Sequence, residues 1–184
     1  MLRRILIIIL VIIVALAVWL WMSTENVLSS ERSVAAKFSE IVTHYVDMGR
    51  QYVTPLSQLF SLPESDQRGL EEIAQDLVSL GNAGGIQQKY SLLLVAQKRT
   101  IDFFTSGGLS DALVTDSRYI EWNTNATSRG KASVLVLEYN QALKLYNNGM
   151  ETIAGKLLQY WPRWQFHEFL GVDGKTQTIV EVRL

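Results

Sequence analysis

Apolar residues recur every three or four positions through most of the chain, a spacing that places them on one face of an α-helix. Four such series follow residue 33, and each predicts a helix. The first two are Val34, Phe38, Ile41, Tyr45, Met48, Tyr52, Pro55 and Leu59, and then Leu70, Ile73, Leu77 and Leu80. The third is Ile86, Tyr90, Leu93, Leu94, Ile101 and Phe104. The fourth is Tyr119, Trp122, Ala126, Val136, Tyr139, Leu143, Tyr146, Met150, Ile153, Leu157 and Tyr160. The pattern therefore predicts an all-α protein.

Glycine, proline and capping residues indicate where these helices bend or end. Pro55 lies inside the first series, where we expect a kink or a lost hydrogen bond that costs about 3 kcal/mol. Ser65 or Asp66 is the expected cap of the second helix. Gly130, Gly149 and Gly155 are expected to bend the fourth helix, at about 1 kcal/mol each relative to alanine. Short loops between four helices predict an elongated antiparallel bundle.

A different pattern precedes the four series. Residues 5–22 read ILIIILVIIVALAVWLWM and carry no charge. As a helix they would span about 27 Å, against about 30 Å for the hydrocarbon core of a bilayer. A cleaved secretion signal and a retained anchor both fit this pattern, and the closing Trp19 and Trp21, typical of the membrane boundary, favour the anchor. Because Arg3 and Arg4 precede the run, we expect a cytoplasmic amino terminus and an exported domain.

The expected organisation follows from these patterns. We predict a cytoplasmic amino terminus at residues 1–4, a transmembrane anchor at 5–22, a juxtamembrane connection at 23–33, a helical bundle domain at 34–172 and a carboxyl-terminal tail at 173–184. In the tail, residues 176–182 read TQTIVEV and allow a short strand or a frayed end.

Composition and motifs exclude several classes of function. Without Arg3 and Arg4, 15 of the 17 basic residues remain beside 18 acidic ones, a net charge of −3 without a basic patch, so nucleic acid is not an expected partner. Because the chain has no cysteine, disulfides, thiolate metal sites and a cysteine nucleophile are excluded. Nucleotide-binding, hydrolase and metalloprotease motifs are also absent from the sequence. Glu40 and His44, four residues apart, supply only half a metal site, and a solvated pair with Asp47 nearby is the favoured interpretation. We expect no catalytic residue, cofactor or metal.

The stretch EYNQALKLYNNGM repeats a Tyr-Asn pair after seven residues, or two helical turns. Two interpretations are open. The tyrosines can bury their rings in a packing seam while the asparagines fix its register. Alternatively, the pairs line a groove between the first and fourth helices and bind a ligand, with Ser133 and Asn123 alongside. The candidate groove residues are Tyr45, Tyr52, Tyr139, Asn140, Tyr146 and Asn147.

Aromatic residues gather in the stretch YWPRWQFHEFLG near the carboxyl end. An antiparallel bundle would return this stretch to the bilayer, where aromatic side chains favour the interface. The candidate interface or docking residues are Trp161, Trp164, Phe166 and Phe169. A packed aromatic terminus is the alternative.

The Tyr-Asn repeats, followed by Trp161-Pro162 and by Gly171, resemble the carboxyl-terminal signature of the LemA family. Arg50 and Pro55 resemble the arginine-to-proline stretch in that family's first long helix. The resemblance covers residues 117–172 and 34–62 but not the middle of the chain, and Gly49 stands where a second arginine is common. It implies a single-pass membrane protein with an antiparallel helical domain and no established catalytic activity.

We therefore expect a membrane-anchored interaction protein, an adaptor or scaffold of the bacterial cell envelope, in the inner membrane. Its expected partners are the lipid bilayer and another envelope protein, and its long coiled-coil-like seams also suit a homo-oligomer. The alternative is an extracytoplasmic sensor or small-ligand-binding module that uses the Tyr/Asn groove.

Overall fold

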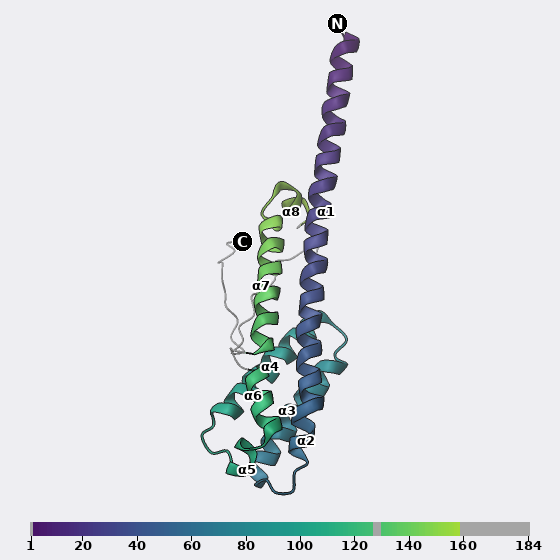
Figure 1. The fold of residues 1–184 in the computed structure, drawn as a ribbon. Helices are drawn as coiled ribbons and strands as arrows, with labels where there is room; N and C mark the ends of the chain where they lie inside the picture. Colours follow the sequence, from purple (N-terminus) through teal and green to yellow (C-terminus); the bar gives the residue numbers. More distant parts are fainter. Residues whose placement is uncertain (1, 127–129, 159–184) are drawn as a thin grey trace. The chain divides into compact units, whose positions relative to one another are not determined.

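The computed structural model describes residues 2–126 and 130–158, and every regular element in these ranges is helical (Figure 1). The all-α prediction is confirmed. The elements are α1 (Leu2–Met48), the π-helical turn η1 (Gly49–Val53), α2 (Thr54–Ser57), α3 (Glu64–Asn82), α4 (Ile86–Thr105), α5 (Asp111–Val114), α6 (Ser117–Ala126), α7 (Lys131–Met150) and α8 (Ile153–Leu158).

The described residues form two compact units. The smaller unit contains residues 2–36 of α1 together with residues 141–158, which are the end of α7 and α8. The larger unit contains residues 37–140 and therefore the remaining helices. The long helices α1 and α7 each contribute to both units.

In the smaller unit, the apolar run forms the first part of α1 and is exposed. Most side chains along it keep about half of their surface or more, as in Ile5 at 54% and Met22 at 62%, whereas Val27 is 2% exposed. The predicted connection at residues 23–33 is helical throughout. Among the described residues, one helix is long and apolar enough to cross a membrane.

The end of α7 runs antiparallel to α1 within the smaller unit. Tyr146 lies close enough to Glu31 for the carboxylate to affect its hydroxyl. A Cβ added to Gly149 would lie 3.2 Å from Cγ2 of Val27, so the two helices pack closely there. As residue numbers rise along α7, those of the neighbouring positions on α1 fall.

The larger unit is built around the predicted apolar series. Phe38, Ile41, Tyr45, Met48 and Tyr52 of the first series are buried, as is every member of the second. Helices α3 and α4 pack against each other, and α3 also contacts α2 and η1. Four rings of α4 and α6 form an aromatic cluster in which ring centroids lie 4.5 to 6.4 Å apart. Its members are Phe103, Phe104, Tyr119 and Trp122.

The expected disruption at Pro55 takes the form of a π-helical turn. Proline lacks an N–H, and its ring would clash with the carbonyl four residues earlier in a regular helix. The chain widens to the π geometry over Gly49–Val53, where the Thr54 N–H donates to the Gly49 carbonyl, five residues back. Pro55 then lies in the first turn of α2, where its missing donor is tolerated.

Three details of the sequence prediction are wrong. The fourth helix is not one bent helix but three, because Gly130 and Gly155 each lie against the backbone of the preceding helix, where no Cβ would fit. As a consequence of the second break, Ile153 and Leu157 are exposed instead of buried, and Ile86, at the start of α4, is exposed too. Pro63, not Ser65 or Asp66, precedes the first residue of α3.

Candidate functional site

The tyrosines predicted to line a groove are core residues. Tyr45, Tyr52 and Tyr139 are 2%, 6% and 3% exposed in the larger unit, and Tyr146 is 1% exposed in the smaller one. Asn140 belongs to the larger unit and Asn147 to the smaller, and both are half-buried. The six residues are therefore divided between the two units, and their ligand-binding role stays a prediction.

Tyr139 contributes to an aromatic contact that joins three helices of the larger unit. The ring of Phe38, from α1, lies 6.0 Å from the Tyr139 ring of α7 and 6.2 Å from the Tyr90 ring of α4, measured between centroids. Tilted aromatic pairs at such distances add about 0.5 to 1.5 kcal/mol beyond their buried area. This contact supports the packing interpretation of the first Tyr-Asn pair.

Tyr45 makes a buried polar contact that the sequence did not indicate. The Nε2 atom of Gln97, on α4, donates a hydrogen bond of 3.1 Å to the Tyr45 hydroxyl. Burial raises the pKa of Tyr45 to about 12, although the bond from Gln97 opposes that rise. Gln97 is 1% exposed, and its Oε1 atom makes no hydrogen bond to the described residues. A buried amide of this kind stabilises only the one helix register in which its partner is in reach.

Tyr52 connects η1 to α6. Burial raises the pKa of its hydroxyl, and a hydrogen bond to the Glu121 carboxylate raises it further. Helix α6 also packs against η1. The π-helical turn is thus held by α6 and by α3, so the irregular geometry around Pro55 is part of the packed structure.

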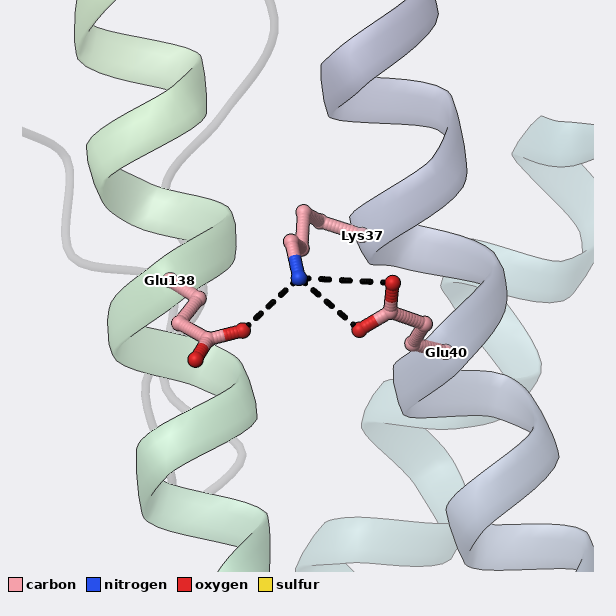
Figure 2. Close-up of polar contacts among 3 residues, drawn as sticks. All are labelled: Lys37, Glu40 and Glu138. Atoms are coloured by element: carbon pink, nitrogen blue, oxygen red, sulfur yellow. Dashed lines mark hydrogen bonds and ion pairs between the residues drawn. The ribbon is translucent and has the colours of Figure 1, made fainter.

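An ion bridge joins α1 to α7 at the surface of the larger unit (Figure 2). The Nζ atom of Lys37 lies 2.8 Å from the Glu138 carboxylate and 3.0 Å from that of Glu40. These bonds, the one to Glu138 first, raise the pKa of Lys37. Sequence spacing indicated only the local pair with Glu40, three residues away on the same helix.

Glu40 and His44, whose spacing supplies half a metal site, make other contacts. The Glu40 carboxylate pairs with Lys37, whereas His44 donates a hydrogen bond to the Asn125 backbone. Since Nε2 of His44 is buried without a partner in the described structure, the donor is Nδ1. Residues 2–126 and 130–158 contain no group of three His, Cys, Asp or Glu side chains that could hold a metal ion.

Asp66 has a structural role that differs from the predicted one. The residue is 3% exposed, and its carboxylate accepts hydrogen bonds from the Ser110 backbone N–H at 3.0 Å and from the Ser110 hydroxyl at 2.6 Å. Ser110 directly precedes α5, so Asp66 fixes the loop that leads into that helix. Only the tertiary structure reveals this contact, because 44 residues separate the two side chains.

The larger unit also carries apolar side chains on its outer surface. On α7, Val134 and Leu137 are 53% and 58% exposed and lie one turn apart. The neighbouring Val136 and Tyr139 belong to the buried series, so α7 has apolar residues on two faces. We call Val134 and Leu137 the outer face of α7. In the sequence, Val134 and Leu137 lie three residues apart beside the main apolar series, and this second spacing could have revealed the outer face.

The aromatic candidates Trp161, Trp164, Phe166 and Phe169 lie outside the described residues, as do residues 176–182, for which the sequence allows a short strand or a frayed end. No protein-family model, curated protein or solved structure matches the chain. The functional conclusion therefore rests on the residues of this chain alone.

Proposed function

We propose that this protein is a membrane-anchored helical adaptor or scaffold of the bacterial cell envelope, held in the inner membrane by residues 5–22. The exposed apolar run of α1 carries the proposal. It contains 13 isoleucine, leucine and valine residues and no charge. At the centre of a membrane helix each contributes about −0.3 to −0.6 kcal/mol, so insertion is favourable by roughly 4 to 8 kcal/mol.

The second support is the unbroken passage from this run into the folded part of the smaller unit. Residues 2–36 belong to one continuous helix, and close packing against α7 begins by Val27. A continuous helix keeps its two ends at a fixed distance from each other, whereas a flexible linker does not. The proposed role of the anchor is therefore to hold the end of α7 at a set distance from the bilayer.

The outer face of α7 is the proposed partner surface in the larger unit. Exposed apolar side chains at interfaces lose contact with water when a partner covers them. Here Val134 and Leu137 lie beside Glu138, whose carboxylate is already paired with Lys37. A partner could therefore cover this face without leaving a buried unpaired charge there.

Site-specific photocrosslinking in cells tests the adaptor proposal. A photoreactive residue at Leu137 should give a discrete adduct, whereas one at Asp102, an exposed polar position on α4, should not. An adduct of about twice 20.8 kDa would identify a second copy of the chain, and another mass would identify a different envelope protein. The absence of any adduct from Leu137 in cells that produce the full chain would contradict the proposed surface.

The resemblance to the LemA family and the arginines at positions 3 and 4 support the proposed topology. A reporter fused after Leu184 that is active only outside the cytoplasm should be active. A matched fusion to a chain with added arginines after Met22 should lose activity, because the charge balance across the run is then reversed. Activity of a cytoplasm-specific reporter after Leu184 would overturn the orientation.

The alternative function, small-ligand sensing, predicts a different result. A ligand at 100 times its dissociation constant raises the unfolding free energy by about 2.7 kcal/mol. A thermal-shift screen of metabolites with the full chain in detergent would detect such a rise. The adaptor proposal predicts no shift, and a shift that is abolished by Tyr45→Phe would support the sensor.

A further inference from the structure

Helix α8 carries an apolar ridge without a protein partner among the described residues. Ile153 and Leu157 are 63% and 45% exposed and lie four residues apart, on one face of the helix. Ala154 is 0% exposed, and Gly155 is also buried. Lys156, exposed between these faces, is the only charged residue of α8.

The buried face of α8 is set against the end of α7. A Cβ added to Gly155 would collide with the Gly149 carbonyl oxygen and with the backbone of Met150. Two hydrogen bonds fix the turn between the helices, from the Thr152 N–H to the Gly149 carbonyl and from the Gly155 N–H to the Thr152 hydroxyl. The ridge of Ile153 and Leu157, on the other side of α8, therefore points away from the end of α7.

The part of α1 that packs against Gly149 shows what lies beyond the carboxyl end of α7. Because α7 runs antiparallel to α1 in this unit, the direction past Met150 leads toward the apolar run. Gly149 packs against Val27, which follows Met22 by five residues, or about 8 Å of helix. The headgroup layer on each side of a bilayer is about 5 to 8 Å thick. If residues 5–22 fill the hydrocarbon core, α8 lies at the level of the lipid headgroups.

We propose that α8 is a second membrane contact, in which Ile153 and Leu157 insert into the boundary between headgroups and acyl chains and Lys156 reaches the lipid phosphates. This inference rests on the proposed anchor. The chemistry is that of an interfacial amphipathic helix, with an apolar face in the acyl boundary and a cation beside it. A long lysine side chain can keep its charge at the headgroups while its stem stays near the apolar layer.

The absence of native cysteine allows a direct test. Single variants Ile153→Cys, Leu157→Cys, Val14→Cys and Val134→Cys of the full chain are labelled with a small fluorophore and reconstituted into phosphatidylcholine and phosphatidylglycerol vesicles. Quenching by lipids that carry a spin label near the top of the acyl chain is then measured. Val134 is the matched control because it is 53% exposed, in the same range as Ile153 and Leu157, but lies 15 residues before Gly149 on α7, about 23 Å along that helix.

We expect several-fold stronger quenching at positions 153 and 157 than at position 134. Lipids labelled deep in the acyl chain should quench position 14 and leave 153 and 157 weakly quenched. Equal, weak quenching at 153, 157 and 134, with position 14 quenched, would overturn the role of α8 and leave the anchor intact. Weak quenching at position 14 as well would overturn the anchor itself, and the inference with it.

Discussion

Gly49, in the π-helical turn, lies directly against Leu77 of α3. A Cβ added to Gly49 would lie 2.8 Å from Cδ1 and 3.0 Å from Cβ of Leu77, closer than side chains pack. The turn can approach α3 this closely only because position 49 has no side chain.

Gly49→Ala should therefore destabilise the larger unit by about 1 to 3 kcal/mol, because Leu77 or the turn must move. Urea unfolding of the full chain in detergent, followed by circular dichroism, measures the change. Gly84→Ala is the matched control, since nothing lies within 4 Å of a Cβ there. A loss of stability at Gly84 equal to that at Gly49 would argue against the close packing.

Trp122 should be among the most important core residues. It is 1% exposed and contacts Phe103, Phe104 and Tyr119. Trp122→Ala should cost about 3 to 5 kcal/mol through lost burial and the cavity left behind. Ile120→Ala, two residues away on the same helix but 53% exposed, should change stability by less than about 0.5 kcal/mol. Similar losses in the two variants would contradict the described orientation of α6.

The contact between Gln97 and Tyr45 predicts a non-additive pair of substitutions. Tyr45→Phe should cost about 1 to 3 kcal/mol, because it leaves the buried Gln97 amide without its partner. Adding Gln97→Met removes the amide and keeps most of its volume, so the double variant should be more stable than Tyr45→Phe alone. If the two losses simply add, the hydrogen bond does not form in solution.

Stability should fall in mild acid because of His44. Burial, and to a lesser extent Lys131, lowers the pKa of His44 below its usual 6.5, although Asp47 and the bond to Asn125 oppose the shift. The unfolded chain therefore takes up a proton first, and the unfolding free energy decreases as the pH drops below about 6.5, until folded His44 is protonated as well. His44→Asn, which keeps a donor for the Asn125 carbonyl, should flatten this part of the profile. An unchanged slope would show that another group is responsible.

The sequence predicted the parts of the fold that depend on helical periodicity. The buried positions Phe38, Ile41, Tyr45, Leu70 and Leu143 all came from three- and four-residue spacing, which reports directly on one helix face. Periodicity did not predict the structure where one close contact between a glycine and a neighbouring backbone decides the geometry. From the sequence, Gly155 was expected to bend the fourth helix. In the structure it lies against the Gly149 carbonyl, and the turn between α7 and α8 leaves Ile153 and Leu157 exposed.

Polar contacts between distant residues were also beyond sequence reasoning. The bond between Lys37 and Glu138 joins positions 101 residues apart, and periodicity says nothing about which charges meet across two helices. Tyr45 was singled out as an aromatic on a seam, but its buried partner, Gln97, carried no signal because an amide inside an apolar helix pattern reads as a surface residue.

Extraction of membranes with alkaline carbonate tests the central claim, that residues 5–22 span the bilayer, most directly. The full chain should stay in the membrane pellet with integral proteins, whereas a chain that starts at Ser23 should be released. A variant with Ile9→Arg and Ile13→Arg should also be released, because each charge at the centre of the helix costs about 2.5 to 3.5 kcal/mol. Release of the full chain into the soluble fraction would contradict the membrane anchor and every role built on it.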